Sequence, residues 1–230
     1  YETAGCVYPA TGIMVIGAVL KKAGFSVSLI DGTIDPKYKE SVLAKILDRT
    51  LFVGFSTMTS QIAMGYELAK KIKEKSPDTP IIFGGIHPTL FPEQVVLNPY
   101  IDIAVINEGA KTVLEIMDYL NGKTQLEDIR GIAFCDTEGN IKINPPRPLD
   151  DISEIPHFDF ELLDVSRYLN ATSVYERELR HNGDGSIHLM PILTGLGCCF
   201  RCAFCINVIL ERRYRVRSAS SIVEEIKRLQ

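Results

Sequence analysis

The alternation of short apolar runs with helix-like segments between residues 10 and 121 constrains the fold of this chain most strongly. Such regular alternation is typical of a parallel sheet with helices on both faces. We therefore predict an α/β, Rossmann/flavodoxin-like fold. The predicted strands are 25–31, 51–56, 80–85 and 102–107, and the predicted helices are 12–24, 36–49, 60–75, 92–97 and 110–120.

One strand of a flavodoxin-like order is not found in the sequence. The chain opens on loop-like residues 1–11 and enters a helix directly, whereas the first strand of that order lies inside the sheet. Without it, neighbouring strands would lose hydrogen-bond partners. We therefore expect the first strand to precede Tyr1 in the native gene product.

Two further units follow the alternating region. Residues 131–144 read as two strands around a turn, a hairpin appended to the sheet. Four prolines between Pro145 and Pro156 indicate an extended linker. From Pro191 a new unit begins with an apolar strand at 191–195, and Ser221 with Glu224 predicts a capping box for its last helix. The predicted boundaries are 1–143, 144–190 and 191–230.

Composition excludes several classes of protein. A net charge of −4 gives no reason to expect a nucleic acid or an anionic membrane as partner. No apolar run approaches the ~18–20 residues that span a bilayer, and the start does not resemble a secretory signal. We therefore expect a cytoplasmic, reducing location. The basic segment 212–217 is interpreted as a solvated face or a phosphate or carboxylate contact rather than a nucleic-acid site.

Four of the six cysteines fall within residues 198–205. Cys198, Cys202 and Cys205 have C-x3-C-x2-C spacing, and three thiolates can hold three irons of a four-iron cluster while the fourth iron stays open. A structural zinc ion prefers four protein ligands, so a zinc site would need His188 or Cys199 as well. Cys6 and Cys135 have no metal-like neighbours and are predicted to be core or surface thiols.

With Phe204 in its aromatic position, this loop resembles that of the radical S-adenosylmethionine (radical SAM) enzymes. The resemblance implies that Cys198, Cys202 and Cys205 ligate a 4Fe-4S cluster whose open iron binds the amine and carboxylate of S-adenosylmethionine. Phe204 would then pack near the adenine. Residues 191–230 would form only the first βα unit of the radical SAM TIM-type barrel, so we expect the isolated fragment to be inactive.

Residues 9–143 resemble the cobalamin-binding domain of radical SAM proteins, because "VGFSTMT", "FGGIHPT" and "VINEGAKT" fall at three successive strand ends. An open α/β sheet binds its ligand beyond the carboxyl ends of its strands. Short hydroxyls could bind a nucleotide tail, glycines permit close approach, and a helix amino terminus offers free amides. The predicted cobalamin contacts are Ser56, Thr57, Thr59, Gly84, Gly85, Glu108 and Gly109. A generic flavodoxin-like domain, with glycines that only form turns, is the alternative.

The loop that would supply a lower axial histidine to cobalt, "VYPATG", holds no histidine. Bound cobalamin is therefore expected base-off, with no histidine on cobalt. His87 lies in a different loop and is expected to shape the turn at Gly84 and Gly85. Asn107 and Ala110 depart from the Gly-Glu-Gly-Glu that this family commonly has at that strand end.

The resemblance implies methyl transfer to an unactivated carbon or phosphorus as the most common chemistry, with cyclisation or rearrangement as alternatives. A methylthiotransferase would need three further cysteines in the leading domain, where Cys6 and Cys135 are too few. A cobalamin carrier module and a zinc-stabilised binding protein are alternatives from other classes. The expected partners are a small-molecule or peptide substrate and an electron donor such as flavodoxin or ferredoxin.

Overall fold

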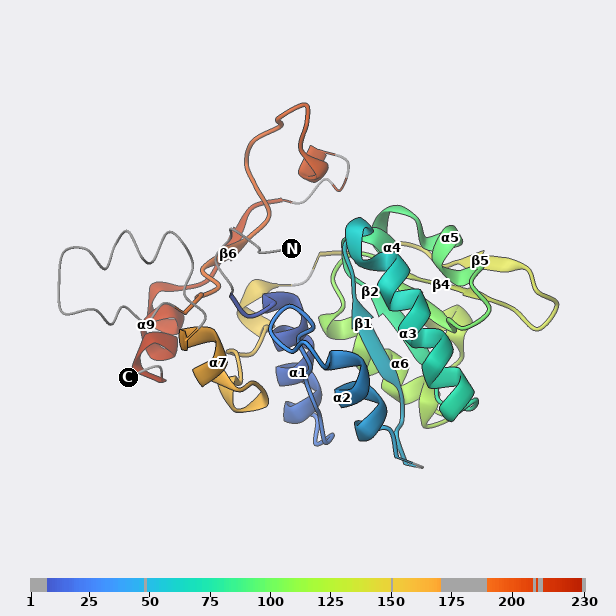
Figure 1. Cartoon of the computed structure of the whole chain (residues 1–230). Coiled ribbons are helices and arrows are strands. Elements are labelled where there is room, and N and C mark those ends of the chain that lie inside the picture. Colours follow the sequence, from blue (N-terminus) through green and yellow to red (C-terminus); the bar gives the residue numbers. More distant parts are fainter. Residues whose placement is uncertain are drawn as a thin grey trace.

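A computed structural model describes residues 8–47, 49–149, 151–170, 190–208, 210 and 213–228. Its centre is a five-stranded sheet in the order β1-β2-β3-β4-β5 (Figure 1). β1 (Val53–Ser56), β2 (Ile81–Gly84) and β3 (Ile103–Val105) are parallel. β4 (Ile132–Cys135) and β5 (Ile141–Ile143) extend the sheet as an antiparallel hairpin. The predicted strands after residue 50 and the appended hairpin are thus confirmed.

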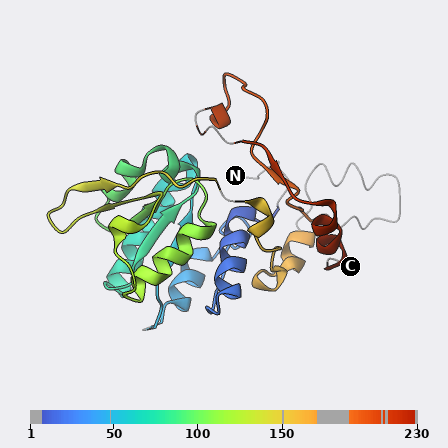
Figure 2. The same cartoon turned by 180° about the vertical axis from the view of Figure 1, so that it is seen from behind.

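Successive strand residues point to opposite sides of the sheet, and here both sides are apolar, so helices cover both faces. Phe83 packs in the cluster formed with α3 (Ile62–Lys75) and α5 (Pro92–Val96), and its ring stacks on Phe55 at 4.5 Å between centroids. Ile82 faces the other way, into a cluster with α6 (Ala110–Leu120). α1 (Thr11–Lys22) packs beside α6 on that second face, as the rear view shows (Figure 2).

The first helix ends as predicted, because Gly24 adopts a φ of +91° and the Phe25 amide donates to the Leu20 carbonyl at 3.0 Å. The prediction of a strand at 25–31 is wrong: this segment forms no ladder with any described strand. A strand requires a neighbour, and β1 pairs only with β2 within the described residues. The next helix, α2 (Tyr38–Lys45), is shorter than the predicted 36–49.

The proline-rich linker lies against the sheet domain instead of standing free. Lys21 on α1 forms an ion pair with Asp159 at 2.6 Å. Tyr168 donates to the carboxylate of Asp31 at 2.9 Å, and burial together with this hydrogen bond raises the pKa of Tyr168. The linker therefore has a defined path across the domain.

The last unit contains β6 (Gly195–Leu196), β7 (Arg215–Val216) and α9 (Ala219–Arg228). β6 and β7 form an antiparallel pair that the sequence did not predict, and β6 is shorter than the strand expected at 191–195. The predicted capping box is wrong, because α9 begins earlier and the Ser218 hydroxyl accepts from the Ser221 amide at 3.2 Å. Ser221 instead contacts Arg217.

The remaining helical elements are short, and none of the described helices is long and apolar enough to cross a membrane. They are η1 (Thr59–Gln61), α4 (Ile86–Leu90), η2 (Leu126–Asp128), η3 (Ile152–Glu154), η4 (Phe160–Leu162), α7 (Val165–Asn170) and η6 (Ile206–Val208).

Candidate functional site

The carboxyl ends of β1, β2 and β3 meet at one edge of the sheet, which we call the strand-end edge and define by residues 56–59, 84–87 and 107–109. The Thr57 amide donates to the Gly84 carbonyl at 2.9 Å, and the His87 amide donates to the Thr57 carbonyl at 3.1 Å. The Asn107 amide donates to the Thr89 hydroxyl at 2.9 Å, which ties the third loop to the second. The seven predicted cobalamin contacts therefore lie at one edge.

Gly85 has a structural reason to be glycine. Its φ is +97°, and a Cβ there would lie 2.8 Å from both the amide nitrogen and the carbonyl oxygen of Thr57. A Cβ on Gly84 would meet its nearest atoms, the Phe55 carbonyl oxygen and the Val105 Cβ, only at 3.8 Å. Gly85 is therefore needed for the crossing of two loops, whereas Gly84 remains open to a close ligand approach.

Three buried polar atoms of the strand-end edge have no hydrogen-bond partner among the described residues. They are Thr57 Oγ1, His87 Nε2 and Asn107 Oδ1, one after each parallel strand. Thr57 is 6% exposed and His87 only 2% exposed. Because buried polar groups in proteins are nearly always satisfied, these three atoms at neighbouring strand ends are available to a polar ligand or to ordered water.

His87 is the residue of this edge whose role the sequence reasoning missed. Its Nδ1 lies 3.2 Å from the Thr59 hydroxyl, so Thr59 is directed at His87. Burial lowers the pKa of His87, which keeps the ring neutral at pH 7 and leaves one nitrogen available as donor or acceptor. The His-Pro-Thr tripeptide one residue after Gly-Gly could have suggested this, because the His87 amide donates to the Thr57 carbonyl and so places the ring beside the Thr57 loop.

Glu108, a predicted cobalamin contact, is engaged by another part of the chain. Arg215 Nη1 donates to its Oε2 at 3.0 Å, and Arg215 Nη2 donates to its Oε1. Gly109 precedes α6, and a Cβ there would lie 3.1 Å from Ile16 on α1. The first of these two residues therefore joins the sheet domain to the last unit, and the second permits helix packing.

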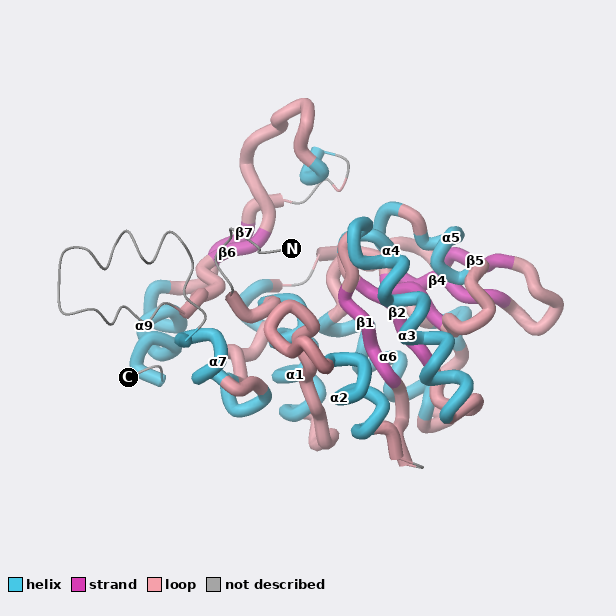
Figure 3. The backbone as a smooth tube through the Cα atoms, viewed as in Figure 1, coloured by secondary structure: helices cyan, strands magenta, loops and turns pink. Residues whose placement is uncertain are grey.

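The cysteine loop, residues 197–205, follows β6 on the path to β7. It extends away from the five-stranded sheet (Figure 3). Phe204 is 94% exposed and Phe200 71% exposed. The Cys205 amide donates to the Cys202 carbonyl at 2.9 Å, and the Phe200 amide donates to Cys198 Sγ at 3.4 Å. In the described part of the chain, no three Cys, His, Asp or Glu side chains gather as metal ligands.

Three thiols on one short loop are nevertheless a donor set that an iron–sulfur cluster can use. Metal binding and ordering of the ligand loop are commonly coupled, so such thiols need not converge in advance. His188, the fourth ligand of the zinc alternative, lies outside the described residues, as do His181 and Cys6. Cys135 lies on β4, where its thiol contacts the Val96 carbonyl at 3.2 Å.

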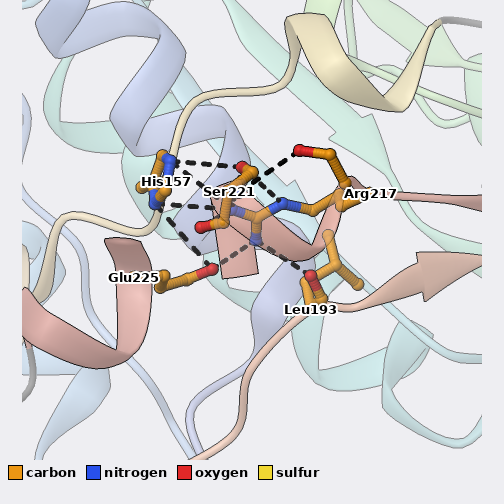
Figure 4. Close-up of polar contacts among 6 residues, drawn as sticks. His157, Leu193, Arg217, Ser221 and Glu225 are labelled. Carbon is orange, nitrogen blue, oxygen red and sulfur yellow. Dashed lines mark hydrogen bonds and ion pairs between the residues drawn. The ribbon is translucent and has the colours of Figure 1, made fainter. Parts of the chain in front are cut away.

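The basic segment supplies carboxylate contacts within the chain. Arg217 is buried and donates to the Glu225 carboxylate, to the Leu193 carbonyl at 2.9 Å and to the Ser221 hydroxyl at 2.8 Å (Figure 4). The ring of His157, from the linker, completes this cluster. Burial, with the neighbouring Arg217 charge, lowers the pKa of His157. Two of the arginines considered for nucleic acid, Arg215 and Arg217, thus bind carboxylates.

Comparison with known proteins agrees with the position of the strand-end edge. A family model described as "B12 binding domain" matches residues 2–117. An uncharacterized methyltransferase of Pyrococcus horikoshii is 28% identical over 227 residues, which cover 96% of this chain and 46% of that protein. An anaerobic magnesium-protoporphyrin IX monomethyl ester cyclase of Synechocystis is 27% identical over 222 residues, covering 95% and 42%. The chain spans less than half the length of these curated relatives.

Solved structures show the same fold. The cobalamin-dependent S-adenosylmethionine radical enzyme OxsB, with aqua-cobalamin and S-adenosylmethionine bound, superposes with a TM-score of 0.73 at 19% identity. That match covers 96% of this chain and 28% of OxsB. The radical S-adenosylmethionine methyltransferase TsrM of Kitasatospora setae, with cobalamin and a 4Fe-4S cluster bound, has a TM-score of 0.67 at 21% identity, covering 98% and 44%. The predicted α/β fold class is confirmed.

Proposed function

Because this chain belongs to the family of B12-binding domains, we propose that it binds cobalamin at the strand-end edge. The observation that carries this proposal is the set of orphaned polar atoms on Thr57, His87 and Asn107. Cobalamin is rich in amide groups that both donate and accept hydrogen bonds, so it could satisfy a hydroxyl, a neutral imidazole and an amide oxygen together. The open space at Gly84 would admit the ligand close to the backbone.

We further propose that Cys198, Cys202 and Cys205 hold a 4Fe-4S cluster and that the protein is a cobalamin-dependent radical SAM enzyme. When bound, cobalt would supply a centre that accepts and donates a methyl group, and the cluster would supply an electron to S-adenosylmethionine. This chain would contribute three thiolates, and the exposed ring of Phe204 would be free to pack on the adenine. The structural neighbours OxsB and TsrM support this pairing of sites.

The chain also supports base-off binding of cobalamin. Residues 7–12, the loop expected to supply a lower axial ligand, hold no histidine, which supports binding without an imidazole on cobalt. His87 itself is buried and directed by Thr59, which suits a contact to the periphery of the ligand rather than to the metal.

For the reaction, we propose methyl transfer to an unactivated centre. The methyltransferase names of two curated relatives support it, those of P. horikoshii and of the cytidylyl-2-hydroxyethylphosphonate methyltransferase of Streptomyces wedmorensis. The cyclase of Synechocystis favours ring formation as the second candidate. We propose a cytoplasmic enzyme that acts on a small molecule or peptide and receives electrons from a flavodoxin or ferredoxin.

Anaerobic reconstitution, followed by counting iron, sulfide, cobalt and zinc per chain, tests both sites. We expect four irons, four sulfides and one cobalt. Replacing Cys198, Cys202 and Cys205 together by serine should remove the iron and leave the cobalt. The neighbouring Cys199→Ser variant is the matched control and should keep its iron, sulfide and cobalt. One tightly bound zinc and no iron would instead establish a zinc-stabilised protein, and cobalt with no iron would establish a carrier module.

A further inference from the structure

The geometry points to Arg215 as a positioning residue: we propose that its ion pair with Glu108 sets the position of the cysteine loop relative to the strand-end edge. The inference rests on the proposed function, because it assigns a purpose to holding those two sites at a defined separation. Through this ion pair, segment 213–217 contacts the loop that follows β3.

Arg215 is connected to both sites. Its backbone pairs with Leu196 in the β6–β7 ladder, and Leu196 lies two residues before Cys198. Its guanidinium makes two hydrogen bonds to Glu108, which directly follows Asn107 and its orphaned amide oxygen. One residue thus spans the distance between the base of the cysteine loop and the strand-end edge.

The pair has the properties of a directional contact. Its side chains are only 16% and 17% exposed, so water screens them weakly. A guanidinium that binds both carboxylate oxygens fixes orientation as well as distance, which a lysine cannot do. A Cβ on Gly195 would lie 2.9 Å from the Arg215 carbonyl oxygen, so the ladder behind the pair is closely packed.

β7 is held from its other end by Arg217. Arg215 and Arg217 are two residues apart and so extend on the same side of an extended chain. Arg217 fastens β7 to Glu225 on α9 and to His157 of the linker (Figure 4). Arg217 thus connects β7 to α9 within the last unit, while Arg215 connects that unit to the sheet domain.

Such fastening matters for a reaction shared between two cofactors. A misplacement of about 1 Å in a reacting geometry can cost about 100-fold in rate. Loss of a pair that positions the loop should therefore change the distance between the two sites without changing which cofactor each site binds.

We would compare Arg215→Met with Arg213→Met in the intact protein. Arg213 is an exposed arginine of the same basic segment and serves as the matched control. In the cofactor-free protein, amide hydrogen exchange should become at least about tenfold faster in Arg215→Met, both at 107–110 and at 193–197. The Arg213→Met variant should exchange like the wild type. Equal exchange in the two variants would overturn the proposal.

In the loaded protein, electron paramagnetic resonance can measure the magnetic coupling between cob(II)alamin and the reduced cluster. Arg215→Met should weaken or broaden this coupling at unchanged iron and cobalt content. A coupling in Arg215→Met that matches the wild type would overturn the proposal.

The two proposals fail in different ways. If the wild type binds no cobalt or no iron, the proposed function is wrong. The amide hydrogen exchange of the cofactor-free variants still decides the role of Arg215. If Arg215→Met does not fold, Arg215→Lys replaces it, because lysine keeps the charge and loses the double hydrogen bond. Faster exchange at both segments in Arg215→Lys than in Arg213→Met would support the pair, and equal exchange would overturn it.

Discussion

The strand-end edge and the cysteine loop differ in how much of each site the fold has already built. At the strand-end edge, backbone hydrogen bonds between successive loops hold Thr57 and His87 in buried positions. In the cysteine loop, Phe204 is almost wholly exposed and the thiols do not gather. The first site is a product of sheet topology, whereas the second would take its final shape only with the proposed cluster bound.

Because of this difference, we expect binding of the two proposed cofactors to respond differently to mutation. A preorganised site loses affinity in small steps, because each contact contributes separately. A site that forms with its metal is lost altogether when one ligand is removed. Five measurements test that contrast.

Single replacement of Cys198, Cys202 or Cys205 by serine should have the largest effect. Each variant should lose its iron and the absorption near 400 nm, and radical chemistry should fall to background, because three thiolates are needed to hold the cluster. Cobalt content should not change. Retention of the full iron content in any one of these variants would contradict the contrast.

Gly85→Ala should lower the free energy of unfolding by about 2–5 kcal/mol, since it adds both left-handed strain and a clash with Thr57. Gly24→Ala is the matched control: its φ is also positive but no atom lies within 4 Å, so the loss should be about 1–2 kcal/mol. Chemical denaturation measures both. Equal losses of unfolding free energy in the two variants would contradict a clash between residue 85 and Thr57.

Gly84→Ala separates ligand approach from folding. The added Cβ has only ordinary contacts at 3.8 Å, so the free energy of unfolding should change by less than about 1 kcal/mol. If cobalamin approaches the backbone here, its Kd should nevertheless rise. An unchanged Kd would place the ligand elsewhere along the edge.

Thr57→Val should have opposite effects on folding and binding. Removing an orphaned buried hydroxyl should leave the free energy of unfolding unchanged or raise it by about 1 kcal/mol, while the Kd for cobalamin rises about tenfold. Thr112→Val is the control, because that buried hydroxyl accepts from Arg147 Nε at 2.9 Å. It should lower stability and leave the Kd unchanged.

The smallest effect should be the pH dependence from His87. Burial lowers its pKa in the folded state, so the unfolded state binds the proton more readily below the usual value of 6.5. The contribution of His87 to stability is therefore complete above that pH and is lost as the pH falls through the folded pKa. Denaturation at about pH 7.5 and about pH 5.5 should show a smaller difference for His87→Gln than for wild type. The same stability difference between the two pH values in both proteins would show that His87 does not contribute to the pH dependence.

Sequence patterns predicted the parallel strands well because those strands are covered on both faces and read as apolar runs. They failed at 25–31, since an apolar run forms a strand only beside a partner, and β1 pairs only with β2 within the described chain. They also placed the last helix cap at Ser221 when Ser218 supplies it. Ser221 has Glu224 three residues later and so matches the sequence pattern of a capping box, but its hydroxyl is engaged by Arg217 in the structure.

The candidate site divides in the same way. Glycines, short hydroxyls and clustered thiols are recognisable by residue type, so the sequence alone was enough to predict the strand-end edge and the cysteine loop. Which polar atoms of that edge lack a partner, and that Arg215 binds Glu108, depend on residues up to 107 positions apart. Local pattern records the chemistry available to a chain, but pairing between distant side chains follows from packing, and only the tertiary structure decides it.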